Sequence, residues 1–170
     1  MNITKPTEIS TLERAKRLCT TASFLVVLQY RRMRIEEPED GNFMFRVLAD
    51  FQFFITALMR LRKSAEIATK APSVKKVIRR AITDFENAVP NLTHMRDVLE
   101  HIDDYAQDNG KHTWIERQQL EVAVWDGTTY DWLGIKFNIE TASVAAEKLF
   151  LTIRDIVDQH LNASDRSTLN

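Results

Sequence analysis

The sequence has few of the residues that interrupt regular structure, with only four glycines and four prolines among 170 residues. Its single cysteine, Cys19, cannot form a disulfide within the chain, and this is typical of a protein kept in a reducing compartment. No apolar run approaches the ~18 residues that a membrane span needs. The first ten residues, MNITKPTEIS, have neither the basic start nor the apolar core of a secretion signal. These absences predict a cytoplasmic protein with no membrane contact.

An excess of charge of either sign is also missing, because 23 Lys and Arg residues face 24 Asp and Glu residues. No overall field therefore draws the chain to nucleic acid, and any contact with RNA has to be local. Basic clusters at residues 31–34, 60–63 and 75–80 are candidates for such contacts. The length suits one domain. We expect this domain to span residues 1–161, followed by a disordered polar tail at residues 162–170.

The hydrophobic pattern predicts an all-α fold, an antiparallel bundle of four or five helices with an inserted β-hairpin. The expected helices cover residues 10–34, 42–69, 73–89, 92–108 and 138–161. Five phenylalanines between residues 43 and 54 are expected in the core of the second helix. The hairpin is expected at about residues 114–137, around the Asp126-Gly127 turn, with Leu120, Val122 and Val124 on one side of it. It should pack on the bundle or on a partner, for which its tryptophans are candidate anchors.

The segment LTHMRDVLEHIDDYAQD, residues 92–108, has an unusual choice of polar residues for a helix. Helical spacing predicts one apolar stripe, formed by Leu92, Met95, Leu99, Ile102 and Ala106. A second stripe carries titratable groups, namely His94, Asp97, His101, Tyr105 and Asp108. Arg96 and Glu100 lie on a third. The helix therefore presents a polar face of mixed titratable groups beside an apolar one.

Cleavage of RNA without a metal needs a base for the 2′-hydroxyl, an acid for the leaving oxygen and a cation for the phosphate. Histidine can serve as acid or base near neutral pH, which indicates this role for His101. Arginine binds two phosphate oxygens at once, which suits Arg96 to the scissile phosphate. Asp97 would orient His101, and Tyr105 or His94 would line the cleft. One chain offers a single Arg–His pair here, and two chains side by side would supply both acid and base.

The run Arg96-Asp97-Val98-Leu99-Glu100-His101 resembles the signature of the HEPN superfamily, an Arg separated from a His by four to six residues. The resemblance implies a helical bundle that forms a homodimer and acts as a metal-independent endoribonuclease of a toxin–antitoxin or defence system. It implies a cleft at the dimer interface in which Arg96 and His101 of the two chains meet. A second run of this kind, from Arg154 to His160, ends in the last predicted helix.

Other interpretations of the same residues stay open. Arg96 and Glu100 can form an ordinary ion pair on a solvated helix, with His101 at the edge of the core. His94, Asp97 and His101 have the spacing of metal ligands but lack a clear fourth ligand, so we expect no metal. No phosphate-binding loop or Cys-x-x-Cys motif occurs, and no cofactor is predicted. The alternative function is a non-catalytic protein–protein interaction module that binds an antitoxin or another protein.

Overall fold

The computed structural model of the protein describes residues 6–35 and 42–168, and this part of the chain is mostly helical with one small antiparallel sheet. The turn predicted at residues 36–42 lies almost wholly outside the described residues. The helices are α1 (Glu8–Met33), α2 (Phe43–Ala68), α3 (Lys75–Ala88), α4 (Leu92–Glu100), α5 (Ile102–Ala106) and α6 (Ile139–Thr168). A short 3-10 helix, η1 (Arg117–Leu120), precedes the strands β1 (Ala123–Trp125), β2 (Thr129–Trp132) and β3 (Ile135–Asn138). The predicted fold class is therefore confirmed in outline.

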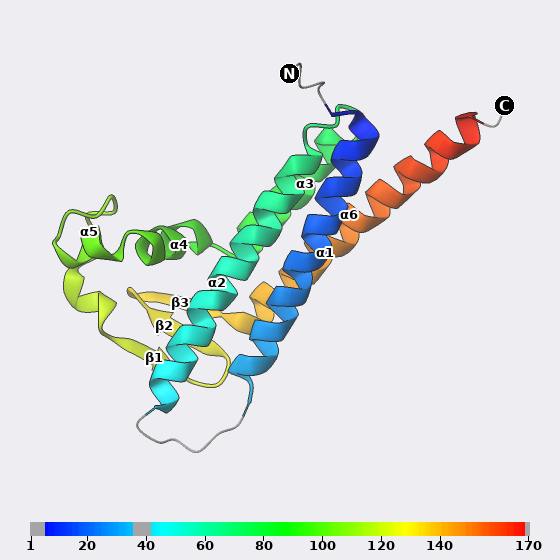
Figure 1. Ribbon diagram of the computed structural model, residues 1–170. Helices are drawn as coiled ribbons and strands as arrows, with labels where there is room; N and C mark the ends of the chain where they lie inside the picture. The colour runs from blue at the N-terminus through cyan, green and yellow to red at the C-terminus, as the bar shows by residue number, and fades with distance from the viewer. Residues whose placement is uncertain (1–5, 36–41, 169–170) are drawn as a thin grey trace, which may run out of the picture.

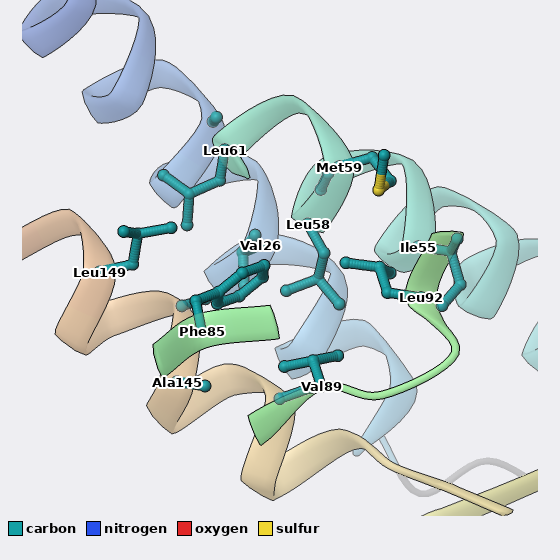
Figure 2. Close-up of a cluster of buried hydrophobic side chains, with 14 of the residues drawn as sticks. Val26, Ile55, Leu58, Met59, Leu61, Phe85, Val89, Leu92, Ala145 and Leu149 are labelled. Carbon is teal, nitrogen blue, oxygen red and sulfur yellow. The ribbon is translucent and has the colours of Figure 1, made fainter. Parts of the chain in front are cut away.

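Four helices, α1, α2, α3 and α6, pack around a shared apolar core (Figure 1). α1 packs against α2 and α6, and α3 packs against the same two helices. Figure 2 shows the centre of this core, where Val26, Leu58 and Phe85 meet from α1, α2 and α3, and Leu149 comes from α6. Removing this apolar surface from water is the main favourable term in folding. The helical spacing of apolar residues therefore predicted these four helices correctly.

The ends of α1 and α6 differ from the prediction. The side chain of Thr7 accepts a hydrogen bond from the amide of Ser10 at 3.2 Å, so α1 begins before residue 10, where the helix was predicted to start. α6 runs to Thr168 and thus continues through most of the segment expected as a tail. Residues 169–170 lie outside the described part. Among the described helices, none has both the length and the apolarity to cross a membrane.

The phenylalanine-rich start of α2 is only partly buried, which corrects the expectation that all of it faces the core. Phe51 and Phe54 are fully buried, whereas Phe45 and Phe53 are 73% and 61% exposed. Phe53 directly precedes a buried phenylalanine, so the helical turn points it away from the core that Phe54 enters. These exposed rings leave apolar surface on the outside of α2.

The inserted β-structure has three strands in the order β1-β2-β3 instead of the two that were predicted. The Asp126-Gly127 turn joins β1 and β2 as expected, and the Asp126 carboxylate accepts hydrogen bonds from the amides of Thr128 and Thr129 at 2.9 and 2.6 Å. These amides hold the pKa of Asp126 below its ordinary value. The prediction missed the turn at Leu133 and Gly134, whose φ angles of 58° and 69° are those of a tight hairpin.

The sheet packs on the bundle through aromatic rings of β2 and β3. Tyr130 stacks on Phe51 of α2 with ring centroids 4.1 Å apart, and Phe137 meets the same ring edge-on at 5.5 Å. Trp132 is buried, and its indole donates to the carbonyl of Leu120 at 3.3 Å. Of the residues predicted on one side of the first strand, Val122 and Val124 are exposed, so this side does not face the core. The second strand supplies the buried contacts instead.

Candidate functional site

The segment predicted as one helix at residues 92–108 is broken at His101 into α4 and α5, which project from the side of the bundle (Figure 1). His101 has φ −127° and ψ 37°, outside the helical region. Its carbonyl accepts from the amides of Asp104 and Tyr105, and so it starts the next turn. The predicted apolar stripe therefore does not continue as a buried face beyond the break. Ile102 is exposed, and Val98 is buried in α4 instead.

Arg96 forms an ion pair with Glu100 one turn later on α4. Its Nε is buried and has no hydrogen-bond partner among the described residues. The side chain of His101 is 54% exposed, and its Nδ1 lies 3.9 Å from Asp104 Oδ2. In the described part of the chain, Arg96 and His101 share no hydrogen bond or ion pair with each other, and each faces a carboxylate.

The carboxylate of Asp97 lies beside Tyr105 and His112. In the described structure Asp97 meets His101 only through its backbone carbonyl, which accepts from the His101 amide at 3.0 Å, and not through the imidazole that it was expected to orient. The hydroxyl of buried Tyr105 donates to Asp97 Oδ2 at 3.0 Å and accepts from the backbone amide of His112 at 3.2 Å. His112 Nε2 lies 3.6 Å from the same Asp97 oxygen. Burial raises the pKa of Tyr105, the amide of His112 lowers it, and the hydrogen bond to Asp97 raises it again, with a net increase. Tyr105 thus holds the following loop onto α4.

Gly110, in the loop that follows α5, lies against this tyrosine. A Cβ added at Gly110 would stand 2.2 Å from a ring carbon of Tyr105. Only a residue without a side chain allows the loop to cover the ring so closely. The close approach explains how Tyr105 is buried although its helix has only five residues, Ile102–Ala106.

A cluster of three aromatic rings forms where this loop meets the start of α4, and the prediction identified only its first member, His94. The rings of His94 and His112 lie 4.4 Å apart at 67°, and the ring of Trp114 lies 5.9 and 6.2 Å from them. Trp114 is 50% exposed. His112 and Trp114 were not predicted as site residues, although three of the four histidines lie between residues 94 and 112. We call these three residues the His–Trp cluster.

Of the five predicted site residues, only His94 lines one of the described hollows. This hollow has a volume of about 210 Å³, and Asn91 and Thr93 line it beside His94. Arg62 from α2 and Glu86 from α3 complete its polar lining and bond to each other at 2.8 Å. A larger groove of about 310 Å³ between α3 and α6 and another of about 330 Å³ between α1 and α2 are apolar and lie away from α4.

The three basic clusters differ in their surroundings. Arg32 bonds to the buried carboxylate of Asp50 at 2.6 Å, which ties the first cluster to α2. Arg62 of the second cluster is held by Glu86. The third cluster is exposed on α3 and consists of Lys75, Lys76, Arg79 and Arg80. In the described residues, no group of three acidic, histidine or cysteine side chains is arranged to hold a metal ion.

Comparison with protein-family models, with curated proteins and with solved structures finds no match for this chain.

Proposed function

We propose that this chain is a HEPN-like helical-bundle protein that binds RNA and cleaves it without a metal. His101 acts as acid or base, and Arg96 binds the scissile phosphate. The observation that supports this most is the helix break. It leaves the His101 imidazole exposed at the junction of α4 and α5, where an RNA strand can reach it. General acid–base catalysis by a positioned imidazole contributes about 10²–10⁴-fold to such a reaction.

The ion pair of Arg96 with Glu100 is compatible with this role. Pairs of this spacing on a helix contribute only about 0.2–0.5 kcal/mol. A phosphate, which accepts two hydrogen bonds from the guanidinium through two of its oxygens, can therefore replace Glu100 as the partner of Arg96. The carboxylates of Asp103 and Asp104 oppose phosphate binding, since they lie beside His101 in the first turn of α5. RNA therefore has to gain affinity elsewhere on the surface, and the exposed basic cluster of α3 suits that purpose.

The proposed active form is a homodimer in the cytoplasm, in which two copies of Arg96 and His101 share a groove. A second copy would add the second imidazole that the reaction needs, because the partner that the His101 side chain has among the described residues is a carboxylate, that of Asp104. A toxin–antitoxin or defence system is the proposed setting, with an antitoxin as a further partner.

The second candidate function is a non-catalytic protein–protein interaction module. The observation that favours it is exposed apolar surface on α1 and α2, where Phe24 is 72% exposed and Leu28 and Phe53 are also exposed. Exposed apolar side chains that gather in one patch mark contact sites in many proteins. The tryptophans of the hairpin contribute less than the sequence suggested, because Trp132 is buried.

Incubation of the purified protein with mixed RNA in excess EDTA separates the two candidates. The nuclease proposal predicts cleavage that His101→Ala reduces at least 100-fold. His160→Ala is the matched control, because it removes the histidine of the second Arg–His run at the far end of α6, and it should leave cleavage unchanged. No cleavage by the wild-type protein would favour the interaction module, and equal cleavage by the two variants would refute the role of His101.

A further inference from the structure

The His–Trp cluster has the composition of a nucleobase-binding surface, with Trp114 half exposed and the two imidazoles partly buried, and it lies on the same arm of the molecule as His101. We propose that Trp114, His94 and His112 form a subsite for one unpaired base of single-stranded RNA. This inference rests on the proposed function and names how the RNA is held, while Arg96 and His101 keep their proposed roles.

Aromatic surface is available because Trp114 is half exposed beside two imidazole rings. Unpaired bases stack on Trp, Tyr, Phe and His side chains, and one such contact strengthens binding by about 5–150-fold as measured by alanine substitution. The rings of His94 and His112 meet Trp114 at 79° and 47°. At these angles neither imidazole stacks flat on the indole, and half of the Trp114 surface stays exposed.

The two imidazoles are held in place by different residues. His94 Nδ1 lies 3.3 Å from Oδ1 of Asn91, and His112 Nε2 lies 3.6 Å from Asp97. Within the described chain, the second nitrogen of each ring makes no hydrogen bond, so it can serve a base edge as donor or acceptor. The polar hollow of about 210 Å³ next to His94 adds Asn91 and Thr93 as further hydrogen-bonding groups.

The charges around the cluster favour binding by the base over binding by the phosphates. Asp97 contacts His112, and Glu86 lines the hollow with His94, whereas Arg62 of the same hollow is already paired with Glu86. Anionic neighbours repel a phosphate but do not prevent stacking, which needs no charge. Contacts to phosphates would come from the α3 cluster of Lys75, Lys76, Arg79 and Arg80. The two kinds of contact then differ in their dependence on salt.

The test measures binding of a fluorescently labelled 2′-O-methyl oligonucleotide, which has no free 2′-hydroxyl and cannot be cleaved. The full chain should bind it with a change in tryptophan emission that Trp114→Phe removes. Trp114→Ala should weaken binding about tenfold or more. His112→Ala and the conservative His112→Gln should both weaken it, and His160→Ala should not. The slope of log K against log salt should be unchanged in the Trp114 variants. Lys76→Ala removes a phosphate contact and should make this negative slope shallower by about one.

Specificity for unpaired bases is tested with the same assay. A duplex of equal length should bind without the change in Trp114 emission, because its bases are already stacked. A DNA oligonucleotide that gives the same signal as the 2′-O-methyl strand would assign the subsite to unpaired bases of either nucleic acid.

The subsite would be overturned if Trp114→Ala and His112→Ala bind the oligonucleotide within twofold of wild type, and if the tryptophan emission of the wild-type protein does not change on binding. If RNA is nevertheless cleaved and cleavage depends on His101, the proposed nuclease stands and only the subsite fails. If the oligonucleotide binds through Trp114 but RNA in EDTA stays intact, the subsite stands and the nuclease fails. A melting temperature equal to that of wild type shows that a variant is folded.

Discussion

Tyr105→Phe is the most informative test of how the arm of α4 and α5 is held together. The substitution removes one oxygen, which donates to Asp97 at 3.0 Å and accepts from the His112 amide at 3.2 Å, and it keeps the ring beneath Gly110. A hydrogen bond to a charged group contributes about 1.5–3 kcal/mol and a neutral one about 0.5–1.5 kcal/mol. Because Asp97 is partly solvated, we expect a loss of about 2–3 kcal/mol in the free energy of unfolding. For a chain of this size that corresponds to a fall of about 4–12 °C in melting temperature.

Tyr130→Phe is the matched control for this prediction. Tyr130 is as buried as Tyr105, but its hydroxyl has no hydrogen-bond partner in the described structure. Burial raises the pKa of Tyr130 to about 12. Removing a buried hydroxyl without a partner should leave stability unchanged or raise it. Urea unfolding of the two variants gives the comparison directly. Equal stabilities of Tyr105→Phe and Tyr130→Phe would refute the importance assigned to the hydrogen bonds of Tyr105.

Three further predictions follow from other parts of the molecule. Burial raises the pKa of Cys19 to about 12, so roughly 10⁻⁴ of the thiol is ionised at pH 8, and the native protein should react with a thiol reagent only on unfolding. Fast labelling of native protein at pH 8 would contradict its burial. Asp50→Ala should lower the free energy of unfolding by about 2 kcal/mol, since Asp50 is buried and pairs with Arg32, which is half exposed, and with Arg46. A change below about 0.5 kcal/mol would contradict this. Gly110→Ala should cost about 1–3 kcal/mol by displacing the Tyr105 ring, and a neutral result in thermal unfolding would show that the loop adapts freely.

The sequence predicted the parts of the fold that depend on local spacing. Apolar residues three and four positions apart determine which face of α1, α2, α3 and α6 is buried, and this pattern is visible without knowledge of the fold. The Asp126-Gly127 turn was predicted for the same reason, because its residue types act within four positions. The Leu133-Gly134 turn was missed, since Leu133 adopts a positive φ that its side chain disfavours.

The candidate site depended on contacts between residues distant in sequence, and these could not be predicted from spacing. The break at His101 accompanies the burial of Tyr105 under Gly110 and its bonds to Asp97 and to the His112 amide. A helical wheel assumes that the helix continues, so it placed Asp97 beside His101 and overlooked His112. The aromatic cluster was missed because the loop after α5 folds back onto α4.

The chemical nature of the RNA ends produced in EDTA tests the proposed function most directly. Attack by the 2′-hydroxyl with an imidazole as base and a second imidazole as acid leaves a 2′,3′-cyclic phosphate and a free 5′-hydroxyl. We predict these ends for the wild-type protein, and their loss in His101→Ala. Intact RNA, or fragments that carry a 3′-hydroxyl and a 5′-phosphate, would contradict a metal-independent nuclease built on α4.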